Sequence, residues 1–410
     1  MDTSRRATLR MLAAAPVVAA AGSLWAPGTA NAAQALHAAA DTTPAPDAFS
    51  LEPRLGPTKS GPAYTDLIKD LVALRGLRFV KRSALLEHGP SRARRIKGGQ
   101  SGAPEKILDG FAWGTRADRD GRSWMPQGVT TSYDAYGADH RGADPEGFGR
   151  TWLLVSWYLG KPARDARVTF VDITDMRNIR YRHVKLVEPY QRAGRTVYRP
   201  VAFHTGGLAW YRNRLYVPDT KHGLRVFAMD HLMRQTWNGG RSTTYLLPQS
   251  AAYDNDGTGL AYSAVSLDRT HGESEISLVV NEFHHEDGKG EDVPDPRGNG
   301  DRTPRVVRWR LKPGTEWIES KAANEFFPVP GGWNAQGAVL VGGTYYLSRS
   351  AGGRPGSLLA FPRGNPVPKK VRPLATGCED LSYDGRYDAL WNLSEYPGKR
   401  SVCLVSRFVA

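Results

Sequence analysis

An all-β fold is predicted by three features of this 410-residue sequence. Short runs rich in Leu, Val, Tyr and Phe alternate with tight polar breaks containing Gly, Asn and Asp, which is typical of strands joined by hairpins. The clearest case is HTGGLAWYRNRLYVPDTKHGLRVFAMD at 204–230, and units of this kind recur along the chain. The hydrophobic fraction of 40% is typical of a globular chain rather than a disordered one.

Five units can be recognised from residue 124 onward. Each has a strand that starts with polar residues, a hydrophobic strand with polar residues near its end, and an apolar strand. The expected strands are 125–130, 150–158 and 166–174; 207–210, 214–220 and 224–230; 259–268, 275–284 and 305–312; 334–340, 343–350 and 357–362; and 377–383, 387–397 and 401–408.

One such small sheet cannot bury both of its faces, so their repetition predicts a β-propeller. About five blades are expected, with six or seven as alternatives. Residues 77–113 offer a sixth blade; alternatively, 106–113 completes the last blade and closes the ring, which removes an open sheet edge.

The N-terminus has the features of an export signal. Arg5 and Arg6 precede an apolar run at 11–25, and small residues suited to cleavage follow at 30–32. The paired arginines are typical of twin-arginine export, so a secreted, extracellular protein is expected. No later apolar run is long enough to span a bilayer, and we expect no transmembrane segment. The predicted organisation is a signal peptide at 1–32, a disordered lead-in at 33–63 and a propeller domain at 64–410.

Four motifs start the expected innermost strands: QGV, HTGGLAW, QGAV and EDLSY. Together with the leader, these units resemble the exported β-propeller proteins of high-GC bacteria, many of them uncharacterised, over roughly residues 106–408. The resemblance implies the fold and the export route, and it implies no single reaction. The Trp-Asp ending and the recurrent Gly-Gly pairs of two common propeller repeats are missing.

The chain is basic, with a formal net charge of +14. The leader carries three arginines and one aspartate, so about 14 − 2 = +12 remains after cleavage. This balance favours an anionic polymer as a partner, although it is equally typical of a soluble basic protein. A basic cluster at 92–97 has no interleaved aromatic residue, so we expect no nucleic-acid binding. We expect a monomer.

Innermost strands of a propeller line its central channel, so their first residues meet at one axial mouth. His204 is expected to act as an acid or base, because a neutral imidazole exchanges protons near neutral pH. Glu379 is expected to be a second acid or base. Neighbouring residues on a strand point to opposite faces, so only one of Glu379 and Asp380 should face the axis, and we expect Glu379 to do so. The expected substrate-binding residues are Gln127, Gln336, Asp380, Arg349 and Glu395.

The polar ends of the second strands should return to the same mouth. They supply Asp219, Asn281, Glu282, His284, Arg349 and Glu395. Oxygen ligands on Asp219, Asn281 and Glu379 suit a hard cation, so calcium is the expected cofactor if there is one. A structural role is the alternative for each residue. The side-chain amides of Gln127 and Gln336, and His204, can instead form hydrogen bonds to a neighbouring blade.

Other features bear on ligand and compartment. Long insertions at 134–149, 187–200 and 285–304 suggest one decorated face. Aromatic residues near strand ends, Tyr396 among them, either pack between blades or stack on a sugar. Export permits a disulfide between Cys378 and Cys403, but two strand spacings separate them if they lie on the first and third strands of one sheet, and the sequence leaves their pairing open.

Two classes of function remain. One is a hydrolase or lyase that acts on an extracellular carbohydrate, lactone or ester. The other is a non-catalytic protein that binds glycan or protein through its long loops. The sequence contains no HExxH, CxxC, GxSxG or glycine-rich phosphate loop, which argues against the commonest zinc-protease, serine-hydrolase and nucleotide-binding designs.

Overall fold

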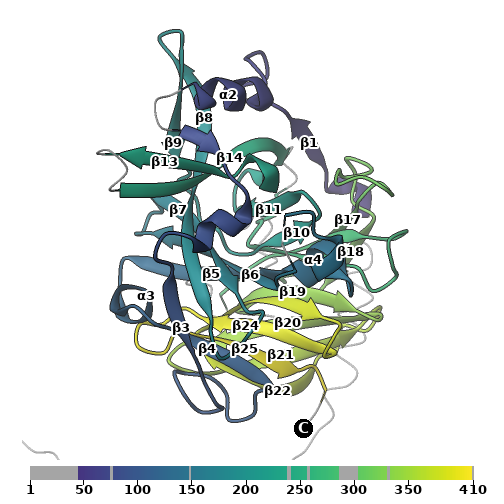
Figure 1. The fold of residues 1–410 in the computed structure, drawn as a ribbon. Coiled ribbons are helices and arrows are strands. Elements are labelled where there is room, and N and C mark those ends of the chain that lie inside the picture. The colour runs from purple at the N-terminus through teal and green to yellow at the C-terminus, as the bar shows by residue number, and fades with distance from the viewer. Residues whose placement is uncertain are drawn as a thin grey trace, which may run out of the picture. The chain divides into compact units, whose positions relative to one another are not determined.

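The computed structural model describes residues 45–73, 77–146, 149–237, 242–255, 259–285, 303–329 and 333–408. The expected signal peptide and the start of the expected lead-in lie outside these residues. From residue 45 onward the described chain forms one unit, which is drawn in Figure 1. None of its helices has the length and apolarity that a bilayer crossing demands.

Strands of the described residues form five antiparallel groups, here called sheets, and a parallel pairing of residues 246–248 with 185–187 joins the first two groups. The first contains β5 (Trp124–Thr131), β6 (Trp152–Leu159), β7 (Asp165–Asp172) and β8 (Arg180–Arg192). The second contains β10 (Ala209–Tyr211), β11 (Arg214–Asp219), β12 (Gly223–Ala228) and β14 (Ser242–Asn255). The third contains β15 (Ala264–Asp268), β16 (Ser277–Asn281), β17 (Arg305–Arg310) and β18 (Glu325–Pro328). The fourth contains β19 (Ala335–Val341), β20 (Thr344–Ala351), β21 (Arg354–Pro362) and β22 (Lys369–Thr376). The fifth contains β23 (Cys378–Asp384), β24 (Ala389–Ser394), β25 (Ser401–Ser406) and β4 (Asp109–Trp113).

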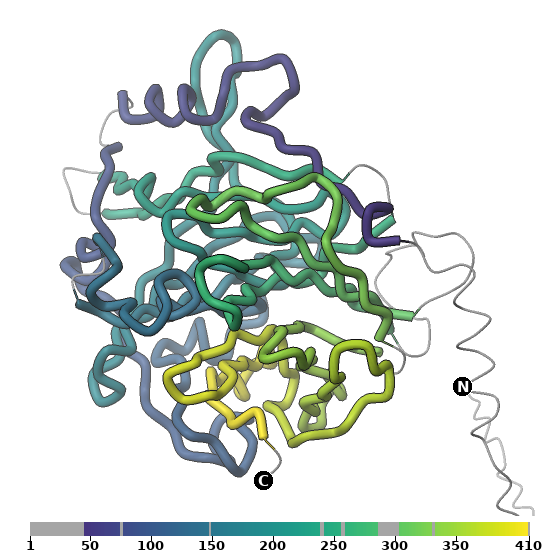
Figure 2. The backbone as a smooth tube through the Cα atoms, turned by 90° about the vertical axis from the view of Figure 1, so that its right-hand side faces the viewer, coloured from purple at the N-terminus to yellow at the C-terminus, as the bar shows by residue number. Residues whose placement is uncertain are grey.

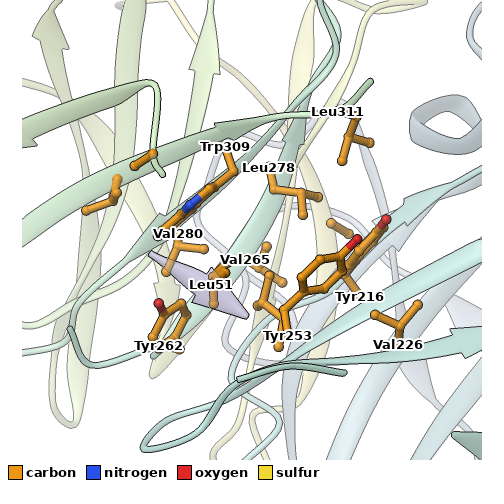
Figure 3. Packing of buried hydrophobic residues seen from close by; sticks show 14 of the residues in the cluster. Leu51, Tyr216, Val226, Tyr253, Tyr262, Val265, Leu278, Val280, Trp309 and Leu311 are labelled. Atoms are coloured by element: carbon orange, nitrogen blue, oxygen red, sulfur yellow. The ribbon is translucent and has the colours of Figure 1, made fainter. Parts of the chain in front are cut away.

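The five innermost strands form a closed ring: β5 contacts β10 and β23, β10 contacts β15, and β19 contacts both β15 and β23. A separate hydrophobic core fills the space between each neighbouring pair of sheets. Figure 3 shows the core between the second and third sheets, where Tyr216 and Tyr253 face Val265, Leu278 and Trp309. Each sheet is stabilised by burying its apolar side chains against the neighbouring sheets. The predicted all-β propeller class is confirmed by this arrangement.

Two strands that come from opposite ends of the described unit pair with each other and close the ring. β4 pairs antiparallel with β25, with Ser401 opposite Ala112, and Figure 1 shows the blue β4 beside the yellow β25. Residues 106–113 therefore complete the last sheet. The rest of 77–113 builds no separate sheet among the described residues, because β2 (Leu77–Phe79) pairs with β13 (Met233–Trp237), and β3 (Ser91–Arg95) pairs with β4 and β8.

A disordered lead-in was expected at 33–63, and this expectation is wrong for the last part of that range. β1 (Leu51–Arg54) pairs with β14, and Phe49 and Leu51 are almost fully buried in the core between the second and third sheets. The Ala- and Pro-rich composition concealed these apolar anchors. Farther along, α2 (Tyr64–Val72) buries Leu67, Ile68 and Leu71. Figure 2 shows this purple helix beside the teal hairpin of β8 and β9 (Arg195–Pro200).

The long insertions do not decorate one face. Residues 134–149 follow the end of the innermost strand β5 and contain α4 (Ser132–Tyr136) and α5 (His140–Ala143), so they lie at the opposite end of the sheet from Gln127. Residues 187–200 form the β8–β9 hairpin. Most of the third insertion, 286–302, lies outside the described residues. The remaining short elements are α3 (Arg116–Asp120), η1 (Pro46–Ala48), η2 (Arg82–Leu86) and η3 (Met229–His231).

Polar side chains from the second strands join neighbouring blades. Ser156 Oγ donates to the carbonyl of Thr205 at 2.7 Å, and Ser348 Oγ donates to that of Glu379 at 2.6 Å. Asn281 Nδ2 donates to the carbonyl of Ala335 at 3.4 Å. These bonds satisfy backbone groups that have no ladder partner between sheets, and they fix the spacing of the innermost strands around the axis.

Candidate functional site: a carboxylate pair at the axial mouth

The first residues of three innermost strands lie in β-bulges. Register shifts occur between Pro126 and Val129 in β5, between Ala335 and Gly337 in β19, and between Cys378 and Leu381 in β23. A bulge re-aims side chains where a strand ends and is frequent next to active sites. Gln127, Gln336 and Glu379 each occupy one of these bulges, so three predicted site residues share a position in their blades.

Glu395 follows the end of β24 and lies close enough to Glu379 for its charge to add to burial in raising the pKa of Glu379. The Glu395 backbone N–H donates to the carbonyl of Gly377 at 3.0 Å, which holds it beside the start of β23. Gln127 Nε2 donates to Glu395 Oε2 at 3.0 Å. The Gln127 side chain thus joins the first part of β5 to the chain just after β24.

The surroundings of Glu379 favour the neutral form of its carboxyl group. Only 2% of the residue is exposed, and burial raises its pKa well above the usual value, with further increases from the negative charges of Glu395 and Asp380; nearby Lys161 acts in the opposite direction. A carboxyl group that keeps its proton at neutral pH can donate it to a bound molecule. Glu395 is more exposed than Glu379, so the pair has unequal environments, which is the arrangement that separates an acid from a base.

Tyr396 and Lys161 complete the surroundings of the pair. The ring of Tyr396 packs on Gly377, where a side chain would come within about 2.9 Å of it. Burial, followed by the charges of Glu395 and Glu379, raises the pKa of Tyr396, so its hydroxyl remains a neutral donor. Tyr396 is half-buried and Lys161 is exposed, which suits an aromatic face and a cation for a bound polar molecule.

Asp380 has a structural role, contrary to the expectation that it binds substrate. It is 0% exposed, and its Oδ2 accepts the backbone N–H groups of Val129 at 3.0 Å and Leu208 at 3.2 Å. One carboxyl group therefore joins three blades across the axis. Glu379 and Asp380 both lie in the β23 bulge, which interrupts the alternation of strand faces, and the expectation that only one of them points inward stays a prediction.

The buried carboxyl groups continue along the axis. Asp380 is followed by Asp134 on α4, whose Oδ2 accepts the hydroxyls of Ser382 at 2.6 Å and Thr130 at 2.8 Å. Burial raises the pKa of Asp134 to about 6, against the opposing effect of these hydrogen bonds. Burial likewise raises the pKa of Asp380 well above its usual value.

His204 lies in the segment before β10 and is half-buried. Its ring meets that of Tyr158 edge-on, with centroids 4.5 Å apart. Burial raises the pKa of Glu379, and the charges of Glu395 and Asp380 raise it further. The catalytic role predicted for His204 stays a prediction.

The residues expected to bind calcium have other contacts. Asp219 accepts hydrogen bonds from Arg225 Nη2 at 2.8 Å and contacts His222 Nδ1 at 3.0 Å. The amide of Asn281 is used in the bond to Ala335. No group of three or more His, Cys, Asp or Glu side chains suited to a metal ion occurs within the described ranges. Calcium binding by Asp219, Asn281 and Glu379 remains an untested prediction.

The other predicted residues are placed as follows. Gln336 is half-buried in the β19 bulge, and Arg349 is half-buried near the end of β20, opposite Ala335 in the ladder. Cys378 and Cys403 are both free and buried, and burial raises the pKa of Cys403 to about 12. These thiols are therefore not reactive at neutral pH.

A buried ion pair near the mouth was only partly anticipated. Glu282, immediately after β16, is 0% exposed. It accepts two hydrogen bonds from Arg305, each of 2.5 Å, and one from the N–H of Ala261 at 3.0 Å. His284 Nε2 lies 3.5 Å from Glu282. Burial alone would raise the pKa of Glu282, but the bonds from Arg305 and His284 outweigh it and lower the pKa.

The sequence analysis omitted Lys161 from the site. It follows the second strand of the first blade just as Glu395 follows that of the last blade. Applying the rule of polar second-strand ends to every blade would have included it.

Comparisons with known proteins give little beyond the fold. No family model matches the chain, and no curated protein matches it in sequence. Among solved structures, an apocarotenoid oxygenase from Synechocystis has 8% sequence identity and a TM-score of 0.28, with 77% of this chain and 72% of that one covered. A Hadza microbial sialidase has 10% identity and a TM-score of 0.28, with 77% and 66% covered. The polysaccharide lyase Uly1 has 10% identity and a TM-score of 0.22, with 62% and 55% covered.

Proposed function

We propose that this chain is an exported enzyme that cleaves a carbohydrate, with Glu379 and Glu395 as its acid–base pair. The observation that supports the proposal is the buried Glu379, whose pKa is raised by burial and by the charge of Glu395, together with the bond from Gln127 to Glu395. Glycoside cleavage commonly uses two carboxyl groups, of which one donates a proton to the leaving oxygen and the other assists attack on the sugar carbon. Export is proposed from the leader sequence.

The proposed reaction is hydrolysis of a glycosidic bond. Glu379 gives its proton to the glycosidic oxygen as the bond from that oxygen to the sugar carbon breaks. A water molecule adds its oxygen to the sugar carbon and passes a proton to the carboxylate of Glu395. The net change is addition of one water across the bond, and transfer of that proton from Glu395 back to Glu379 restores the pair.

The surroundings support a sugar as the substrate. Tyr396 offers a half-exposed aromatic face on which a sugar ring can stack, and Gln127 has an amide beside the pair. Lys161 and the net charge of +14 favour a sugar polymer with anionic groups.

Replacing the pair by amides tests the proposal. Glu379→Gln and Glu395→Gln are each expected to lower kcat/KM by roughly 100-fold or more, because each removes one proton transfer. The assay measures reducing ends and unsaturated sugars released from neutral and anionic polysaccharides, so that hydrolysis and elimination are distinguished. Glu319→Gln, an exposed carboxylate away from the pair, is the matched control and should retain full activity.

Two outcomes would contradict the proposal. The first is activity of both pair variants within a few-fold of the parent on every substrate that the parent converts. The second is tight glycan binding without conversion, which would favour the non-catalytic binding protein.

A further inference from the structure

A second pocket lies away from the carboxylate pair, at the end of the blades where the innermost strands finish. Its volume is about 640 Å³, within the range of small-molecule sites. α4 and α5 contribute one wall, directly after β5, and the turn between β10 and β11 contributes another. Because Gln127 and His204 precede these strand ends, the pocket and the axial mouth are at opposite ends of the innermost strands.

The walls of this pocket are held by internal bonds. Arg82, only 2% exposed, donates to buried Asp144. Tyr136 donates its hydroxyl to the carbonyl of Arg212 at 3.2 Å, and Arg212 has a positive φ of 48° that a non-glycine residue rarely adopts. Asn213 Oδ1 accepts the N–H of Asp230 at 3.0 Å. The pocket is therefore formed before any ligand arrives.

The pocket carries more negative than positive charge, in a chain whose net charge is +14. Its lining contains the carboxylates of Glu146, Asp230, Glu273 and Glu316 against the cations Lys81, Arg82 and Arg212. Asp144 adds a fifth carboxylate just behind the wall, and it neutralises Arg82.

Most of the positive charge is already compensated. Glu273 accepts hydrogen bonds from Arg212 Nη2 at 3.1 Å and from the Tyr211 hydroxyl at 2.9 Å, and it also pairs with Arg269. Arg212 is thus neutralised within the wall. The lining carboxylates that remain are those of Glu146, Asp230 and Glu316, beside the cation Lys81.

Two buried polar atoms of the lining lack hydrogen-bond partners among the described residues. Glu146 Oε2 is a buried acceptor without a partner, 3.9 Å from Arg82 Nη1. Arg82 Nε is a buried donor without one. Leaving an acceptor unsatisfied is unfavourable by about 1–3 kcal/mol, so a ligand that donates a hydrogen bond to Glu146 Oε2 gains affinity, whereas an ammonium or guanidinium group cannot satisfy the Arg82 donor.

We propose that this pocket binds an organic cation: an amine or guanidinium group on a compact apolar body. The cation lies against Glu146, with Glu316 and Asp230 nearby, and the body contacts Ala135, Ala143 and Pro145. The same chemistry occurs in a free polyamine and in a lysine or arginine side chain of a peptide, and the test separates these two sources.

Isothermal titration calorimetry of the purified chain tests the proposal with molecules of matched length. Putrescine represents the free amine, and the peptide Gly-Lys-Gly, blocked at both ends, represents a side chain. Butanediol and succinate are the neutral and anionic counterparts of putrescine and should not bind. Binding of putrescine alone identifies a free amine, and binding of the peptide identifies a side-chain ligand; both support the proposal.

Variants locate the bound cation. Glu146→Gln and Glu316→Gln are each expected to weaken binding about tenfold, because each removes one charged partner. Glu319→Gln is the matched control. Glu379→Gln should leave cation binding unchanged, so this site is tested independently of the proposed reaction. A thermal melt of each variant shows whether it is folded.

The proposal is overturned if neither amine binds, or if butanediol or succinate binds as well as putrescine. It is also overturned if folded Glu146→Gln and Glu316→Gln bind with the affinity of the parent.

Discussion

Replacing Glu282 with glutamine is expected to lower the free energy of unfolding by about 3 kcal/mol. The substitution leaves the guanidinium of Arg305, itself 2% exposed, buried without its counter-charge. Removing one partner of a buried ion pair is far more destabilising than the pair is stabilising, because the remaining charge has lost its water as well as its partner. Urea unfolding followed by fluorescence measures the change.

The stability difference between the parent and Glu282→Gln should also depend on pH. The folded-state pKa of Glu282 is lowered, so the carboxylate contributes stability that is present above the pKa of the unfolded chain and is lost as the pH falls through the folded-state pKa. The difference between parent and Glu282→Gln should therefore shrink as the pH falls below the ordinary range of a glutamate.

The exposed ion pair of Arg95 and Asp109 is the control that isolates the effect of burial. Arg95 makes two hydrogen bonds of 2.9 Å to Asp109, but half of the Arg95 side chain is exposed. Asp109→Asn should change stability little, because water already screens this pair. The double variant Glu282→Gln with Arg305→Met should recover part of the loss. Equal effects of Glu282→Gln and Asp109→Asn would contradict the account.

Asp380→Ala is expected to be destabilising by about 4 kcal/mol. The carboxyl group accepts two buried N–H groups, from Val129 and Leu208, which belong to different blades. Each donor left unsatisfied costs about 1–3 kcal/mol, and the missing side chain adds a cavity on the axis. Urea unfolding again measures the loss.

Asp380→Asn separates hydrogen bonding from charge. The amide oxygen can accept the same two N–H groups, so most of the stability should remain. Because the folded-state pKa of Asp380 is raised, the parent loses stability as the pH rises from the pKa of the unfolded chain toward the folded-state value, whereas Asp380→Asn does not. A loss in Asp380→Asn as large as that in Asp380→Ala would show that the backbone bonds are not what Asp380 provides.

The repeating pattern was sufficient to predict the inner part of each blade. The segments 150–158, 166–174 and 401–408 overlap β6, β7 and β25 because apolar residues of both faces are buried between blades. The outer strands were missed. β8 and β22 contain many charged residues because they lie at the rim, so their apolar pattern is weak.

The site was predictable only as a set of positions. The alignment placed Gln127 and Glu379 at equivalent strand starts, where the structure has bulges, and the rule for second strands included Glu395. Which residues pair was not predictable, because the contact between Gln127 and Glu395 joins positions 268 residues apart. The bonds of Asp380 to Val129 and Leu208 were not predicted, since a bulge leaves no mark in the pattern of apolar residues.

The most direct test of the central claim is the protonation state of Glu379. Infrared spectra of the parent and of Glu379→Gln at pH 7 are compared, so that the other buried acids, Asp380 and Asp134, cancel in the difference. The account predicts a band from a protonated carboxyl group that is present in the parent and lost in Glu379→Gln. A difference spectrum that contains only the bands of an ionised carboxylate would contradict it, because Glu379 would then have no proton to donate.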